Sequence, residues 1–340
     1  MKNFEIEYQH LLEGIQQRVK QTNKRSVLFL IQHSKADETA PHVPCLRESI
    51  TNVIGFVALG DPQYIEHICQ KGADIIDVII VDTDAKRTNS RQIVVEAKAQ
   101  AAKYHIEYAT YSDYASWASS ALAFLSECEM QKYGSDFAEH KHLIIGQSVL
   151  ATRIILEMLN RGMEVYLLEE EYGPMILTTL SGTISINSEN VHLIRTDEPQ
   201  EFASLLACEI GRNSEFLPQL KDFRFGYIYD VGINNFSADF IEAHRKKGSL
   251  ALRSDDRAGM SSLAINIRET RELVTNYMGE KTIGDIRIVS GGIIGESGAV
   301  VVDNYRNPQQ ILGVANGDGV FKSQLSEIDQ QHIDKLQKLL

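Results

Sequence analysis

Cysteine, proline and long hydrophobic runs are all scarce in this sequence. Its 340 residues include 4 cysteines and 7 prolines. The cysteines form neither a C-x-x-C pair nor a zinc-binding spacing, which favours buried thiols in a reducing compartment over disulfides or a catalytic thiol. Apolar runs such as Val27–Ile31 are far shorter than the roughly 20 residues that cross a bilayer, so we expect no membrane partner.

Positive charge is also in short supply. Lys and Arg total 34 against 46 Asp and Glu, a formal net charge of -12, and no basic run offsets it. Binding to a phosphate backbone would be opposed electrostatically, so we expect no nucleic-acid partner. Residues 1–5 show neither a basic region followed by an apolar one nor a small-residue cleavage site, and we therefore expect a cytoplasmic protein.

What remains is the composition of an ordinary globular protein. Hydrophobic residues make up 43% of the chain and charged residues 24%, which excludes a disordered or fibrous class. At about 150 residues per domain, the length suggests two domains.

The first 130 residues alternate between helix and strand patterns. Helices are expected at 4–21, 62–71, 90–103 and 114–130, and strands at 27–31, 53–58 and 75–81. The β-α-β-α order predicts a largely parallel sheet. We interpret the polar segment 131–140 as a hinge between two domains.

A second α/β pattern begins at residue 141. Strands are expected at 142–145, 164–168, 191–194 and 226–231, and helices at 152–161, 199–207, 238–247 and 261–278. Gly162 is the expected C-cap of the first of these helices. Glycine is dense from 286 to 321, which predicts hairpins, and residues 325–340 are expected to be helical.

The turn at residues 146–151 is similar to a dinucleotide-binding fingerprint. It reads G-Q-S-V-L-A, a G-x-G-x-x-G/A pattern with Ser148 at the second glycine and Ala151 at the third. Gly146 permits a tight turn, Ser148 is small enough for backbone to approach a pyrophosphate, and Ala151 allows close packing of helix on strand. Glu169 ends the next expected strand, where a carboxylate can accept the ribose 2′-hydroxyl, so NAD is favoured over NADP. The alternative is a turn from strand to helix that binds no cofactor.

The segment Asp230–Asn234 ends another expected strand. Ligands lie beyond the carboxyl ends of parallel strands, so Gly232 can present backbone to a nicotinamide ring and Asn234 can hydrogen-bond its amide. A turn with a helix cap is the alternative.

Hydride transfer from a carbinol to NAD needs a group that removes the hydroxyl proton. Lys86 follows the expected strand 75–81 and Asp113 precedes the helix 114–130, so both are candidates. A solvated loop lysine and a helix N-cap are the respective alternatives. We interpret Asp82 and Asp84 as a solvated carboxylate pair beside Lys86 rather than as Mg²⁺ ligands.

Several histidines could suggest a metal site. His140 and His142 flank Lys141, and His33 and His42 lie near the first strand, but none has a carboxylate or cysteine partner at a recognisable ligand spacing. We therefore expect no metal.

The order of these segments resembles that of shikimate dehydrogenases. Residues 33–35 (H-S-K) are similar to the family's H-S-K-S-P segment, Lys86 falls where its N-V-T-x-P-x-K lysine would, and residues 112–114 (S-D-Y) resemble its N-T-D segment. Residues 257–260 (R-A-G-M) resemble its G-M segment, and residues 230–234 are identical to a D-V-G-I-N segment of methylene-tetrahydrofolate dehydrogenases. The glycine-rich tail looks like that of archaeal proteins described as quinate 5-dehydrogenases.

The resemblance covers about residues 26–275 and implies a fold and a set of roles. It implies an NAD-binding Rossmann domain at 141–260 and a parallel-sheet substrate domain at 1–130, completed by 261–340, in an α/β protein that we expect to form a homodimer. Lys86 and Asp113 would be the catalytic pair, and Ser34 and Asn89 would bind a small-molecule substrate. The chain departs from H-S-K-S-P at Ala36 and Asp37, which leaves open a quinate-like, amino-acid or folate substrate. A non-catalytic NAD-binding sensor is a further alternative.

Overall fold

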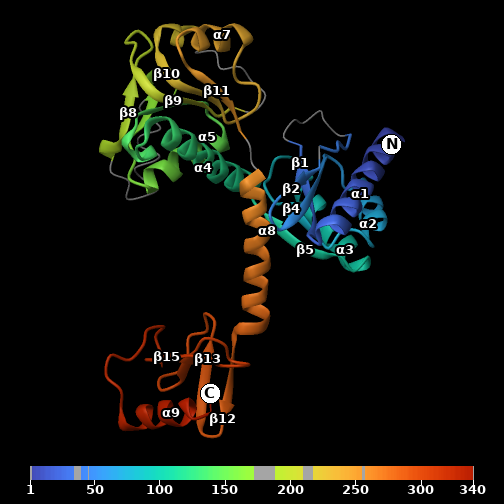
Figure 1. Ribbon diagram of the computed structural model, residues 1–340, viewed down its shortest axis with the longest axis vertical. Coiled ribbons are helices and arrows are strands. Elements are labelled where there is room, and N and C mark those ends of the chain that lie inside the picture. The colour runs from blue at the N-terminus through green and yellow to red at the C-terminus, as the bar shows by residue number, and fades with distance from the viewer. Residues whose placement is uncertain are drawn as a thin grey trace. The chain divides into compact units, whose positions relative to one another are not determined.

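The computed structural model describes residues 2–33, 40–44, 46–171, 188–209, 217–254 and 257–339. By its internal packing the chain divides into two compact units, Met1–Ser262 and Leu263–Leu340. Two of the sheets belong to the first unit and one to the second (Figure 1). Within the described ranges, no helix combines the length and the apolar character needed to span a bilayer.

The first sheet is built on parallel strands, as expected. Its order is β2-β3-β1-β4-β5, with β2 antiparallel at the edge and the other neighbours parallel. Leu28 and Leu30 of β1 pack in one core with residues of the three helices α1, α2 and α3. The strands are β1 (Arg25–Gln32), β2 (Arg47–Glu48), β3 (Asn52–Leu59), β4 (Val78–Asp82) and β5 (Glu107–Tyr111), and the helices are α1 (Lys2–Thr22), α2 (Ile65–Gly72) and α3 (Ser90–Lys103).

The second sheet has the strand order of a doubly wound fold. All its neighbouring strands are parallel, in the order β11-β10-β9-β6-β7-β8. Counted from β6, this is the order 3-2-1-4-5-6 of a Rossmann sheet, with separate apolar cores on its two faces. The elements are β6 (His142–Ile145), α5 (Val149–Asn160), β7 (Val165–Leu168), β8 (Val191–Ile194), β9 (Glu201–Ala207), β10 (Arg224–Asp230), α7 (Ala238–Lys246) and β11 (Leu250–Arg253).

The prediction of a helix at 199–207 is wrong. These residues contain the strand β9, which lies between β6 and β10 in the middle of the sheet. Leu205, Leu206 and Ala207 are all fully buried, because a central strand is covered on both faces. Such a strand shows no alternation of polar and apolar residues, so its pattern cannot be told from that of a buried helix.

The interpretation of residues 131–140 as a hinge is also wrong. Helix α4 (Asp113–Tyr133) begins directly after β5 and continues into this segment. Leu122 and Leu125 of α4 share a core with Ile154 of α5, and Phe137 is buried in the same core. Figure 1 shows α4 beside α5, under the second sheet. The segment is therefore packed against the second sheet and does not link two separate bodies.

The second unit contains a sheet and a core of its own. The sheet order is β12-β13-β14-β15, with antiparallel pairs β12–β13 and β14–β15 and a parallel pair between them, so hairpins are present as expected. Ile288 and Val300 pack with Leu336 of the C-terminal helix. The elements are α8 (Arg257–Glu272), which begins in the first unit, β12 (Gly279–Ile283), β13 (Ile286–Ser290), β14 (Val300–Val302), β15 (Ile311–Val314) and α9 (Glu327–Gln337). Residues 263–340 therefore form a compact unit of their own.

Candidate active site

Two strand ends of the first sheet bring three charged side chains together. Strand β4 ends at Asp82 and is followed by the loop that carries Lys86, while β5 ends just before Asp113, the first residue of α4. Because β4 and β5 are parallel neighbours, their carboxyl ends meet at the same edge of the sheet. Ligand sites of parallel sheets lie at this edge.

Lys86 makes ion pairs with both aspartates. Its Nζ lies 2.5 Å from Oδ2 of Asp113 and 2.8 Å from Oδ2 of Asp82. The exposed fractions of the side chains are 3% for Lys86, 0% for Asp82 and 9% for Asp113. The ring of Tyr114 lies 4.9 Å from the same Nζ, measured to its centroid. This cluster of two carboxylates and one ammonium is nearly closed to water.

Further hydrogen bonds hold the two carboxylates in place. The Tyr111 hydroxyl donates to Oδ1 of Asp113 at 3.1 Å, and the backbone N–H of Asp84 donates to Oδ1 of Asp82 at 2.9 Å. The Asp84 carboxylate in turn accepts from the Ser112 hydroxyl, at 2.8 Å, and from the backbone N–H of Tyr114. The loop after β4 is thereby tied to the start of α4, which keeps Lys86 close to Asp113.

The buried pairing changes the proton affinities of the cluster. Burial by itself lowers the pKa of an ammonium, but Asp113 and Asp82 outweigh it and raise the pKa of Lys86 above its ordinary value. Burial raises the pKa of the Asp82 carboxyl, although Lys86 opposes this. Lys86 is therefore charged at neutral pH. The interpretation of Asp82 as a solvated carboxylate is wrong, because it is fully buried against Lys86.

Of the two residues predicted to bind substrate, the structure describes only Asn89. Ser34 lies outside the described residues. Asn89 ends the loop after β4, and its Nδ2 donates to the backbone carbonyl of Gly60 at 2.8 Å. Its Oδ1 is buried and accepts no hydrogen bond from the described part of the chain. The substrate-binding role of both residues stays a prediction.

The turn after β6 has the geometry that the fingerprint requires. Gly146 has φ of +115°, and a Cβ there would lie 3.0 Å from the backbone nitrogen of Glu209, so glycine is needed. The Ser148 hydroxyl caps α5 by accepting from the backbone N–H of Ala151 at 3.1 Å, and it also donates to the Cys208 carbonyl. Ala151 is 1% exposed, as expected for close packing of helix on strand.

Two glutamates that the sequence reasoning missed contact this turn. The backbone N–H of Gly146 donates to Oε1 of Glu171 at 2.9 Å, and that of Gln147 donates to the carboxylate of Glu209. These are donors that a pyrophosphate would use, and they already hold anionic oxygens. The turn is thus suited to an anion, but a dinucleotide must displace both carboxylates. Glu169 follows β7 directly and is exposed, as its predicted ribose contact requires.

The segment after β10 is shaped by packing against the loop after β9. A Cβ on Gly232 would lie 1.8 Å from the backbone oxygen of Glu209, so this glycine serves a close backbone approach. Asn234 has φ of +62°, and its backbone N–H donates to Oδ2 of Asp230 at 3.0 Å. The turn predicted as the alternative is therefore present. The contacts of Gly232 and Asn234 with a nicotinamide stay predictions.

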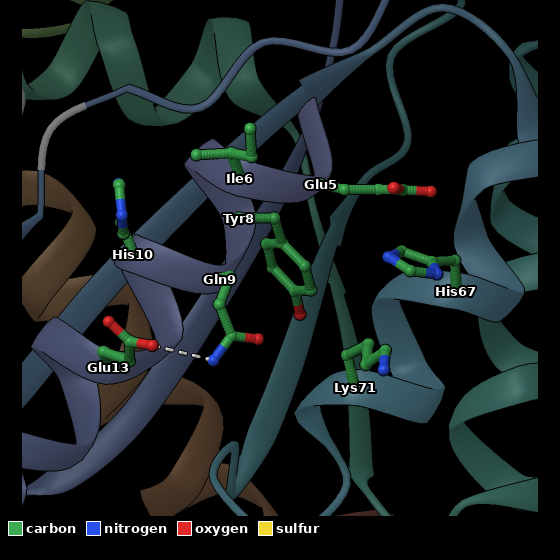
Figure 2. Close-up of a pocket in the computed structure, with 8 residues that line it drawn as sticks. All are labelled: Glu5, Ile6, Tyr8, Gln9, His10, Glu13, His67 and Lys71. Carbon is green, nitrogen blue, oxygen red and sulfur yellow. Dashed lines mark hydrogen bonds between the residues drawn. The ribbon is translucent and has the colours of Figure 1, made fainter. Parts of the chain in front are cut away.

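A different hollow lies between α1 and α2. It has a volume of about 540 Å³, and Figure 2 shows the side chains that line it, among them Tyr8, His67 and Lys71. The Tyr8 hydroxyl donates to the backbone carbonyl of Ile68 at 2.9 Å, an ordinary packing role. None of the predicted site residues lines this hollow. Across the described residues, no three His, Cys, Asp or Glu side chains converge as a metal site.

No protein-family model and no curated protein sequence matches this chain. Among solved structures, it is similar to L-tryptophan dehydrogenase from Nostoc punctiforme, with 10% identity, 73% of this chain and 75% of that chain covered, and a TM-score of 0.42. It is also similar to the hetero-hexameric glutamate dehydrogenase from Thermus thermophilus, with 11% identity, 74% and 69% covered, and a TM-score of 0.40. D-lactate dehydrogenase with NAD⁺ from Lactobacillus jensenii gives 16% identity, 57% and 61% covered, and a TM-score of 0.30. The fold class rests on the strand order and register above, not on these likenesses.

Proposed function

We propose that this protein is an NAD-dependent oxidoreductase that transfers a hydride between nicotinamide and a small substrate bearing a hydroxyl or an amine. The observation that carries the proposal is the buried cluster of Lys86, Asp113 and Asp82 at the carboxyl edge of a parallel sheet. It is supported by the strand order of the second sheet and by the turn at Gly146, both suited to a dinucleotide.

The cluster can supply the proton that such a reaction moves. A bound nicotinamide would give or take the hydride at the substrate carbon. Lys86 is charged at neutral pH, so it donates a proton to the oxygen or nitrogen of a carbonyl or imine as that group is reduced. Asp113 and Asp82 hold the ammonium in place through their ion pairs, and Lys86 regains its proton from solvent after the product leaves. In the opposite direction Lys86 must first lose its proton, so oxidation is favoured by high pH.

The second sheet would hold the cofactor through its first turn. The amides of Gly146 and Gln147 would bind the pyrophosphate once Glu171 and Glu209 move away. Glu169, exposed at the end of β7, would accept the ribose hydroxyl and disfavour a 2′-phosphate, so NAD is the proposed cofactor.

The resemblance to shikimate and quinate dehydrogenases makes cyclic hydroxy acids the first substrates to test. One observation favours an amine instead. The cluster contains two carboxylates and one ammonium, and this excess of negative charge attracts the ammonium group of a substrate. An amino-acid dehydrogenase is therefore the second candidate.

The test is the appearance of NADH absorbance with NAD or NADP and a panel of quinate, shikimate, hydroxy acids and amino acids. Lys86→Arg keeps the charge but moves the donor, and we expect it to lower the turnover of the active compound at least 100-fold. Lys103→Ala is the control, because Lys103 is 54% exposed and pairs with Glu66 at the surface. NAD binding without turnover of any compound would refute the dehydrogenase for these substrate classes and favour the NAD-binding sensor. Full activity of a folded Lys86→Arg protein would refute the role of Lys86 as the proton donor.

A further inference from the structure

The second sheet has a cavity at its amino edge, away from the dinucleotide turn. Its volume is about 500 Å³. The lining residues begin or precede β6, β9, β10 and β11, or lie at the end of α4. The turn at Gly146 instead follows the carboxyl end of β6. Because all these strands are parallel, the cavity and the turn lie at opposite edges of the sheet.

Positive charge gathers in this cavity although the chain is acidic. Four cations line it, and they are Lys132, Lys141, Arg224 and Lys247. Two carboxylates, Glu139 and Glu201, line it as well, so these groups leave an excess of two positive charges in a chain of net charge -12. Among the residues that the structure describes, no carboxylate lies within 4.0 Å of any of the four cations. Each of the four is exposed and can reach a ligand.

Two of the cations have a partial explanation in the fold. Lys132 lies in the last turn of α4 and Lys247 caps α7, where the helix dipole favours a cation. The Nζ of Lys132 also donates to the backbone carbonyl of Gly226 at 3.0 Å, and that of Lys247 donates to the carbonyl of Lys221. These two lysines alone would not indicate a ligand.

Helix ends do not explain Lys141 and Arg224, although the Nζ of Lys141 also lies 5.4 Å from the centroid of the Tyr166 ring. Lys141 directly precedes β6 and Arg224 begins β10, so neither compensates the end of a helix. Their strands lie on either side of β9, which places both cations at the amino edge of the central strand. Glu139 and Glu201 offset two of the four positive charges, and gathering the remaining like charges costs free energy in the absence of an anion. An arginine and several lysines around one cavity suit an anion with several oxygens, which the guanidinium can bind through two N–H groups.

We propose that this cavity binds a small polyanion, a molecule that carries at least two phosphate or carboxylate groups. The site is separate from the dinucleotide turn and does not depend on the proposed function. Its determinants are Lys141 and Arg224, with Lys132 and Lys247 adding to the positive potential.

The experiment is calorimetric titration of the full chain with pyrophosphate and, separately, with citrate, at low and at physiological ionic strength. We expect binding that weakens with salt, because the contacts are between exposed charges. The variant Lys141→Ala/Arg224→Ala should lose at least 10-fold in affinity while keeping the thermal unfolding midpoint. Binding of pyrophosphate alone would assign the site to phosphates, and stronger binding of citrate would assign it to carboxylates.

The matched control is Lys20→Ala/Lys98→Ala, which removes the same charge from exposed positions on α1 and α3. We expect it to bind as the unchanged chain does. The titration is repeated with saturating NAD, which should leave the affinity unchanged. Absence of binding, equal losses in both double variants, or displacement of pyrophosphate by NAD would each overturn the proposal.

Discussion

Removal of the Lys86 ammonium should destabilise the folded chain far more than removal of a surface lysine. Lys86→Met keeps most of the apolar stem but leaves Asp82 and Asp113, which are 0% and 9% exposed, facing the same space without a counter-ion. Removing one partner of a buried ion pair costs about 3–5 kcal/mol, since the remaining charge is buried and unpaired. We expect the free energy of unfolding at neutral pH to fall by about this amount.

The deficit should depend on pH in a predictable direction. Burial and the nearby Asp113 raise the pKa of the Asp82 carboxyl, and Lys86 opposes this, so removal of Lys86 raises that pKa further. A carboxyl with a raised pKa binds more protons in the folded state, so stability is recovered as the pH falls and is lowest at neutral pH. Adding Asp82→Asn to Lys86→Met should restore part of the loss, because one buried charge is then removed.

The assay is urea-induced unfolding followed by tryptophan fluorescence. Trp117 is the one tryptophan of the sequence, and its Nε1 donates to the Ser254 hydroxyl at 3.0 Å, so it reports on the first unit. Lys103→Met is the control, and we expect it to leave the unfolding midpoint unchanged, because its ion pair with Glu66 is solvated. A Lys86→Met chain as stable as this control, or a deficit that does not change between neutral and acid pH, would refute the reasoning.

Three further predictions follow from particular contacts. Glu171→Gln and Glu209→Gln should each tighten NAD binding several-fold in a calorimetric titration, because the charge that competes for the turn amides is removed; unchanged or weaker binding would contradict the fit of the turn to a pyrophosphate. Gly232→Ala should cost about 1–3 kcal/mol of stability, because its Cβ would lie 1.8 Å from the backbone oxygen of Glu209. A urea unfolding midpoint equal to that of the unchanged chain would contradict this, since it would mean that the loop after β9 moves aside without cost. The Lys322 ammonium and Ser326 lower the pKa of Asp329 to about 2, so its contribution to α9 is present above the ordinary carboxyl pKa and is lost as the pH falls towards 2. Asp329→Asn should remove this acid dependence of amide exchange in α9, and an unchanged acid dependence would assign it to other groups.

Local patterns predicted much of the fold. The strand β6 and the helix α3 have the predicted bounds, and the β-α-β unit around Gly146 is present, because turn glycines and short buried strands carry strong local signals. The strand β9 was mistaken for a helix, since burial on both faces erases the alternation that marks a strand. The segment that follows and includes the end of α4 was mistaken for a hinge. Most of its residues are polar, and the one large apolar residue that packs into the core, Phe137, gives too weak a local pattern to predict burial.

The candidate site, too, was predicted only in part from the sequence. The sequence by itself determined which residues could carry the chemistry. Lys86 follows a predicted strand and Asp113 precedes a predicted helix, and ligand sites of parallel sheets lie where strands end and helices begin. It could not determine that Asp82 is buried, that all three groups share one cluster, or that Glu171 and Glu209 occupy the amides of the turn. These contacts join residues far apart in the chain or depend on burial from several elements. Only the pairing of β4 with β5, and the packing of the loops after β7 and β9 against the turn, decide them.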